Sequence, residues 1–295
     1  MIPFVRDFDF AYGRCDQVSP LIRRVVANNP GPFTFTGTAT FIVGEGRVAV
    51  IDPGPDDRDH LRALLAAVAG EQVSHVLVTH THADHSPLAR PFARAVGAPV
   101  LAARPPAPGV HAPVPVEEGD DDSFFPDVVL TGGETFEGPG WTLEALATPG
   151  HASNHLCFAL EQENALFPGD HVMGWSTTVV APPDGDMDAY LASLEAVIAR
   201  GFSTLWPTHG PPVTDVPPFL AAYRAHRLER EAQILARLQA GDRTIADMVP
   251  VLYAAVDRRL WPAASLSVLA HLIRLVRLGK ARADGEPSLT ARFEP

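Results

Sequence analysis

Four side chains that can bind a metal lie in the segment 80–85, which reads HTHADH: His80, His82, Asp84 and His85. Imidazole and carboxylate are the ligands that zinc prefers when no thiolate is offered, and a neutral imidazole binds without first losing a proton. His80 and His82 are two residues apart at the end of an expected strand, so they point to the same side and can share one metal. Asp84 and His85 follow in the turn and can face a second metal. The segment therefore predicts a centre of two metal ions.

Three further candidate ligands follow, each after an apolar run that ends in proline or glycine. His151 ends the run Pro-Gly-His, Asp170 ends Phe-Pro-Gly-Asp, and His209 ends Trp-Pro-Thr-His. A glycine before His151 and before Asp170 lets the backbone approach the site closely. The repeated pattern predicts that all three side chains reach the same centre as residues 80–85.

Such a centre predicts hydrolysis. A water shared between two zinc ions can lose a proton near neutral pH and supply hydroxide as the nucleophile, so no catalytic serine or cysteine is needed. Asp84 is placed to orient that nucleophile, and His155 and His171, which lie just beyond candidate ligands, are candidate general acids. The remaining histidines are expected to be surface or packing residues: His60, His75, His111, His226 and His271.

Strands and helices alternate around these motifs. Residues 40–52 read as a hairpin, and Asp56 or Asp57 caps a helix after it. A buried-type strand at 75–79 runs directly into the HTHADH segment, and residues 187–200 form an amphipathic helix. Strands mixed with helices and hairpins, without a strict βαβ repeat, predict an α/β sandwich with mixed sheets.

From about Pro218 onward, the sequence pattern is typical of helices. The pattern predicts three helices and a terminal tight hairpin, at residues 218–240, 244–253, 265–278 and 279–286. Three helices and a hairpin are the outline of a winged-helix module. The chain is therefore expected to contain two domains, a catalytic domain at 1–217 and a winged-helix-like domain at 218–295.

Charge is unevenly distributed along the chain. The net charge of −12 argues against a generic nucleic-acid binder, because contacts to phosphates need a basic footprint. Residues 221–295 carry 12 Lys or Arg against 8 Asp or Glu, whereas residues 1–220 carry 11 against 27. The two parts thus present different surfaces. A proline-rich, acidic stretch at 104–127 is expected to be a surface loop.

The location of the protein is expected to be cytoplasmic. No apolar run approaches the roughly 18 to 20 residues that cross a bilayer, and the first residues lack the layout of a signal peptide. No membrane partner is therefore expected.

Cys15 and Cys157 lie far apart, which predicts neither a disulfide nor a cysteine-based zinc site.

The sequence resembles the metallo-β-lactamase superfamily across roughly residues 35–212. The five motifs of that superfamily are matched by Asp52 at the end of an early strand, by the HTHADH segment and by the three later ligands. The resemblance implies a four-layer αββα sandwich, followed here by a small helical winged-helix-like domain. It also implies two zinc ions per chain. By this resemblance one zinc is held by His80, His82 and His151, the other by Asp84, His85 and His209, with Asp170 bridging. Asp52 would orient ligands from behind.

Within the superfamily, residues 37–44, residues 177–179 after Asp170, the run His209-Gly-Pro and the helical tail resemble the group called β-lactamase-like protein 2. That resemblance implies an endoribonuclease or phosphodiesterase that acts on single-stranded RNA through a metal-bridging hydroxide.

Two alternatives stay open. The first is hydrolysis of a small thioester, lactone or β-lactam, which the acidic catalytic domain favours because it would repel a polyanion. The second is an iron-dependent persulfide dioxygenase, because such enzymes in the superfamily use a similar HxHxDH string. The natural substrate and the oligomeric state are left open by the sequence.

Overall fold

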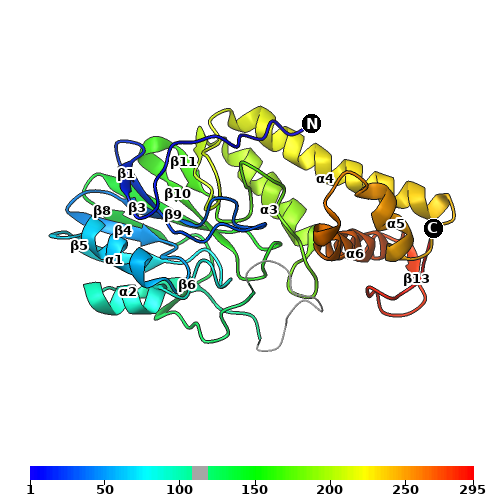
Figure 1. Cartoon of the computed structure of the whole chain (residues 1–295), viewed down its shortest axis with the longest axis horizontal. Coiled ribbons are helices and arrows are strands. Elements are labelled where there is room, and N and C mark those ends of the chain that lie inside the picture. Colours follow the sequence, from blue (N-terminus) through cyan, green and yellow to red (C-terminus); the bar gives the residue numbers. More distant parts are fainter. Residues whose placement is uncertain (108–118) are drawn as a thin grey trace.

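Two β-sheets lie face to face at the centre of the molecule (Figure 1). The structure is a computed structural model that describes residues 1–107 and 119–295. The larger sheet has seven strands in chain order: β1 (Cys15–Gln17), β2 (Ile22–Val26), β3 (Ala39–Val43), β4 (Arg47–Ile51), β5 (Gln72–Leu77), β6 (Val100–Ala103) and β7 (Val128–Leu130). The smaller sheet has five strands in the order β12 (Thr204–Leu205), β11 (Ala165–Phe167), β10 (Leu156–Leu160), β9 (Trp141–Ala147) and β8 (Thr135–Gly138).

Helices cover the outer faces of both sheets. These helices are α1 (Arg58–Ala67), α2 (Ala89–Val96), α3 (Met187–Arg200) and α4 (Val216–Gln239). Leu64 of α1 and Phe92 of α2 pack on the larger sheet, and Tyr190 of α3 and Phe219 of α4 pack on the smaller one. The inner faces of the two sheets share a third apolar core, where alternating strand residues face each other. The expected four-layer αββα sandwich is thus confirmed.

The strands that precede the candidate ligands end at one edge of this sandwich. β4 and β5 are parallel, so the segments that follow Ile51 and Leu77 emerge together. β11 and β12 are parallel too, which brings the segments after Phe167 and Leu205 to a common edge. Side chains far apart in the sequence can therefore meet in one place.

The C-terminal segment forms a small helical unit with a two-stranded sheet. Its elements are α5 (Ile245–Leu252), a 3₁₀ turn η2 (Arg258–Leu260), α6 (Trp261–Arg277), β13 (Arg282–Ala283) and β14 (Phe293–Glu294). Thr244 caps α5 in a capping box with Asp247. The winged-helix-like outline is confirmed, but the expected tight hairpin at 279–286 is wrong. β13 pairs instead with β14, which is separated from it by residues 284–292, because Phe293 of β14 is buried in the apolar core of this unit.

Helix α4 joins the two parts of the protein. Its first half packs on the sandwich through Phe219 and Tyr223, and its second half packs in the C-terminal core through Ile234 and Leu238 (Figure 1). The domain boundary expected between residues 217 and 218 falls at the start of this shared helix and stays a prediction.

The expected surface loop at 104–127 is described only in part. Residues 108–118, which include His111, lie outside the described residues. No helix in the described ranges is both long and apolar enough to span a membrane.

Candidate metal centre

The first group of candidate ligands contains three histidines. Nε2 of His80 lies 3.0 Å from Nδ1 of His82, and Nε2 of His151 lies 3.2 Å from the same His82 nitrogen. One imidazole nitrogen can share a single proton with only one neighbour at a time. Three ring nitrogens that converge on one point therefore form the arrangement expected around a metal ion.

The second group contains Asp84, His85 and His209. Oδ2 of Asp84 lies 3.0 Å from Nε2 of His209 and 3.5 Å from Nε2 of His85. All three side chains are buried, and their ligand atoms also form a cluster that could hold a metal.

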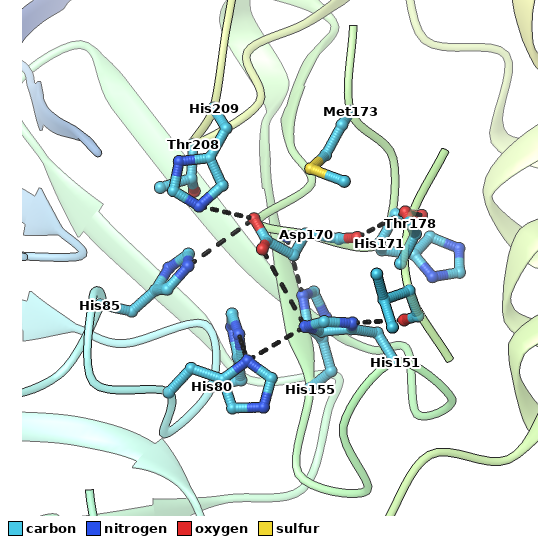
Figure 2. Close-up of polar contacts among 12 residues, drawn as sticks. His80, His85, His151, His155, Asp170, His171, Met173, Thr178, Thr208 and His209 are labelled. Carbon is cyan, nitrogen blue, oxygen red and sulfur yellow. Dashed lines mark hydrogen bonds and ion pairs between the residues drawn. The ribbon is translucent and has the colours of Figure 1, made fainter. Parts of the chain in front are cut away.

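Asp170 lies between the two groups (Figure 2). Its Oδ1 is 3.5 Å from Nε2 of His209 and 3.6 Å from Nε2 of His85, whereas its Oδ2 is 4.0 Å from Nε2 of His151. The carboxylate therefore reaches the second group with one oxygen and the first group with the other. This is the position that a bridging ligand would need.

The separations fit the size of a metal ion. Two ligands of one tetrahedral zinc, each about 2.0–2.1 Å from it, lie roughly 3.3 Å apart. The contacts within each group fall between 3.0 and 3.5 Å. In addition, Nε2 of His85 and Oδ1 of Asp170 are buried polar atoms that have no hydrogen-bond partner among the described residues. Such atoms are rare unless an ion satisfies them, so the residues present fit a pair of metal ions.

Four of the histidines are held in place through the ring nitrogen that faces away from the centre. Nδ1 of His151 donates to the carbonyl of Val179 at 2.7 Å, and Nδ1 of His209 donates to the carbonyl of Gly37 at 3.2 Å. Nδ1 of His80 lies 3.0 Å from Oγ1 of Thr79. A donor at Nδ1 leaves Nε2 directed toward the centre as the free ligand atom.

Asp52 anchors the fourth histidine, His85. Its Oδ2 lies 2.9 Å from Nδ1 of His85, and its Oδ1 accepts from the backbone N–H of Thr79 at 2.7 Å. Oγ1 of Thr79 and Oγ1 of Thr208 donate to Oδ2 at 2.8 and 3.2 Å. Asp52 thus ties the segments before His80 and before His209 to one buried carboxylate, and the expectation that it orients metal ligands stays a prediction.

The two groups differ in protonation. Burial, then the neighbouring His151, lowers the pKa of His82 to about 3, and burial followed by the charge of His85 lowers the pKa of His80 well below its ordinary value. Burial alone would also lower the pKa of His209, but the carboxylates of Asp170 and Asp84 outweigh it and raise this pKa to about 10. Without metal, His209 therefore holds a proton that His80 and His82 do not.

The two candidate general acids lie beside the centre in different settings. His155 is buried, its Nε2 accepts from the backbone N–H of Asp170 at 3.2 Å, and its Nδ1 lies 2.9 Å from Oγ1 of Thr148. His171 is buried against the ring of Tyr190. Burial is the main cause that lowers the pKa of His155 well below its ordinary value and that of His171 to about 3. Both rings are therefore neutral, and their acid role stays a prediction.

Apart from Asp52, the residues that support the ligands were not predicted from the sequence. A threonine directly precedes His80 and His209, and another lies shortly before His151, so this recurrence was a usable signal. No signal pointed to Tyr223, whose hydroxyl accepts from the backbone N–H of Thr178 at 2.8 Å. Oγ1 of Thr178 donates in turn to the carbonyl of Asp170 at 2.7 Å (Figure 2).

Comparison with known families agrees with this arrangement. A family model described as "Metallo-beta-lactamase superfamily" matches residues 33–209, and one described as "Beta-lactamase associated winged helix domain" matches residues 244–290. The chain is 24% identical to a metallo-beta-lactamase family protein of Thermus thermophilus, with a TM-score of 0.75 over 94% of this chain and 99% of that one. At this identity the likeness shows the fold alone.

Among curated proteins, similar sequences carry names of thioesterases. The chain is 37% identical over 227 residues to an "Atrochrysone carboxyl ACP thioesterase" of Aspergillus chevalieri, which covers 76% of this chain and 67% of that protein. It is 30% identical over 290 residues to "Lactamase-like protein adaB" of Aspergillus niger, which covers 92% and 86%. It is also 34% identical to "Thioesterase pkgB" of Emericella nidulans, over 76% of this chain and 60% of that protein.

Proposed function

The chain belongs to the metallo-beta-lactamase superfamily, and on this premise we propose that it is a dinuclear zinc hydrolase that cleaves thioesters carried on an acyl carrier protein. The observation that carries the proposal is the convergence of seven histidine and aspartate side chains on one buried edge of the sandwich, in a chain whose relatives are named as thioesterases. The reaction consumes water and a thioester and yields a carboxylate and a thiol.

The side chains divide between the two metals as the contacts group them. His80, His82 and His151 would hold one zinc, and Asp84, His85 and His209 would hold the other. Asp170 would bridge, since its two oxygens face different groups. When bound, two zinc ions lower the pKa of water into the neutral range and polarise the carbonyl under attack.

The protein itself contributes position and charge. Asp84 and Asp170 remain ionised: burial would raise the pKa of each carboxyl, but the nearby His85 and His209 lower both instead. An ionised Asp84 can accept a hydrogen bond from an attacking water and so orient it. Asp52 and the backbone carbonyls of Gly37 and Val179 keep the imidazoles fixed, so little reorganisation is required during the reaction.

A thiol leaving group suits this site. A cysteine-like thiol has a pKa of roughly 8.5, so it can depart as thiolate with little help from a general acid. An alkoxide leaving from RNA needs a proton much more. Both His155 and His171 are buried and neutral, which favours a substrate that does not demand proton donation from them.

The relatives favour the thioester alternative over the expected endoribonuclease, because none of the similar curated proteins named above is described as acting on RNA. Lactone and β-lactam hydrolysis, and the iron-dependent dioxygenase, share the same ligand types. Metal content and a substrate panel separate these possibilities.

The decisive experiment combines elemental analysis with hydrolysis assays. We expect two zinc ions per chain and release of free thiol from acyl carrier protein thioesters, with no cleavage of single-stranded RNA. His80→Ala should abolish thiol release and lower the zinc content. His75→Gln is the matched control, because His75 lies in β5 and its ring packs on Phe136 away from the centre. Iron as the bound metal, or thiol release that survives His80→Ala, would contradict the proposal.

A further inference from the structure

A second cavity lies next to the loop that supports the metal centre. It has a volume of about 240 Å³ and is bounded by α4, by the region from α5 to α6, and by residues 173–179. The lining residues that carry polar side-chain groups are Trp175, Ser176, Thr177, Thr178, His226, Arg227, Arg230, Tyr253 and Ser267. None of the described residues that line it is Asp or Glu.

No carboxylate among the described residues pairs with the arginines of this cavity. Across the described ranges Arg227 and Arg230 form no ion pair with a carboxylate, although most other arginines of α4 and α6 do. Arg227 is only 4% exposed, and Arg230 lies 4.2 Å above the ring of Tyr253. Two such cations together are unusual in a chain with a net charge of −12.

Among the described residues, four buried nitrogens on the cavity lining have no hydrogen-bond partner: Nε of Arg227, Nε of Arg230, Nδ1 of His226 and Nε1 of Trp175. Burial, and then the charges of the two arginines, lower the pKa of His226 to about 4. Unsatisfied buried donors in a native protein call for a ligand that accepts hydrogen bonds. Arginine favours phosphate, since its planar guanidinium donates two parallel hydrogen bonds to phosphate oxygens.

The cavity shares its wall with the metal centre. Arg227 donates to the carbonyl of Thr178, and the Thr178 hydroxyl donates to the carbonyl of Asp170. The next residue, Val179, also lines the cavity and accepts from His151. A molecule seated in the cavity would thus lie directly beside the loop that positions two candidate ligands.

We propose that this cavity binds the phosphodiester of a carrier-linked thioester, so that the pantetheine arm runs from the cavity to the metal centre. The inference rests on the proposed thioesterase function, because carrier-linked acyl groups are attached through a phosphorylated pantetheine. It assigns Arg230 and Arg227 as binding residues and makes the phosphate a determinant of specificity.

The test compares thioesters with and without the phosphate. For the wild-type protein we expect kcat/KM for an acyl-phosphopantetheine to exceed that for the matched acyl-pantetheine by roughly 10- to 100-fold. Arg230→Gln should bring this ratio close to one, while Arg230→Lys should keep part of it. Arg224→Gln is the matched control on the same helix, since Arg224 pairs with Glu195 and does not line the cavity. A ratio that Arg230→Gln leaves unchanged would overturn the proposal.

A second variant keeps the proposal testable if Arg230→Gln does not fold. Ser267→Asp places a carboxylate in the cavity from α6 without removing either arginine, and it should lower the same ratio. If Ser267→Asp folds and keeps the wild-type ratio, the cavity does not hold the phosphate.

Calorimetric binding separates the failure of this inference from the failure of the proposed function. Phosphopantetheine should bind the zinc-loaded wild-type protein more tightly than pantetheine or inorganic phosphate, and Arg230→Gln should remove the difference. If phosphopantetheine binds in this way but no thioester is hydrolysed, the proposed function is refuted, whereas the proposed phosphate site in the cavity stands. Inorganic phosphate that binds as tightly as phosphopantetheine would refute the carrier arm as the ligand.

Discussion

The carboxylate of Asp52 lies 2.9 Å from Nδ1 of His85, and both side chains are fully buried. Asp52 is also one of the few non-glycine residues with a left-handed backbone, at a φ of 50°. A strained backbone persists where the surroundings over-determine it, which is common at functional sites. Here four hydrogen bonds hold the carboxylate of this residue against the ligand-bearing segments.

Asp52→Asn should weaken metal binding without unfolding the protein. The amide keeps the size of the side chain but loses the charge that holds the His85 ring, so we expect zinc affinity of the second group to fall roughly 10- to 100-fold. Competition with a chromophoric chelator measures this. Asp56→Asn, at an exposed site nearby, is the control and should bind zinc normally. Equal affinity in both variants would show that Asp52 has no such role.

Metal binding to the second group should release protons. In the metal-free protein His85 and His209 are protonated, because Asp84 and Asp170 raise their pKa values, that of His209 to about 10. A metal must displace these protons, so its affinity should fall by up to about tenfold per proton for each pH unit below that value. His80 and His82 should contribute no such loss near neutral pH, because burial lowers the pKa of His82 to about 3 and that of His80 well below its ordinary value.

Zinc titrations in two buffers of different ionisation enthalpy check this prediction. Binding to the second group should show heat that depends more strongly on the buffer than binding to the first group does. Identical proton release in both events would contradict it.

His155 should act by position rather than as a general acid. Its Nε2 accepts from the backbone N–H of Asp170, so His155→Ala should lower kcat and zinc affinity together. His155→Gln should restore much of both, since a glutamine oxygen can replace that acceptor. The shape of the pH–rate profile should be the same for all three proteins. Loss of one limb of the profile in both variants would instead identify His155 as the acid.

Tyr223→Phe should destabilise the loop that carries Asp170. The hydroxyl accepts from the N–H of Thr178 and donates to the carbonyl of Ser176, and its loss leaves buried groups unpaired. We expect a stability loss of about 1–3 kcal/mol and weaker zinc binding. Thermal melts of metal-free and zinc-loaded protein measure both effects. Tyr12→Phe, at an exposed tyrosine, should change neither; an unaltered Tyr223→Phe protein would show that the contact is dispensable.

The fold class and the candidate ligands could be predicted from the chain alone. Ligand type and local spacing are properties of the chain, so the HTHADH segment and the Pro- or Gly-terminated runs before His151 and Asp170 could be recognised without coordinates. Helix periodicity likewise located α3 at residues 187–200.

Which of these groups touch depends on how the strands pair in space. Parallel pairing of β4 with β5 and of β11 with β12 brings Asp52 beneath His85 and Asp170 beside His209, and pairing between distant strands leaves no local trace in the chain. For the same reason, the roles of Tyr223 and Arg227 could not be predicted from the sequence. Their spacing on α4 is that of any buried helix face, and their role arises because this helix happens to cross the loop that ends at Val179.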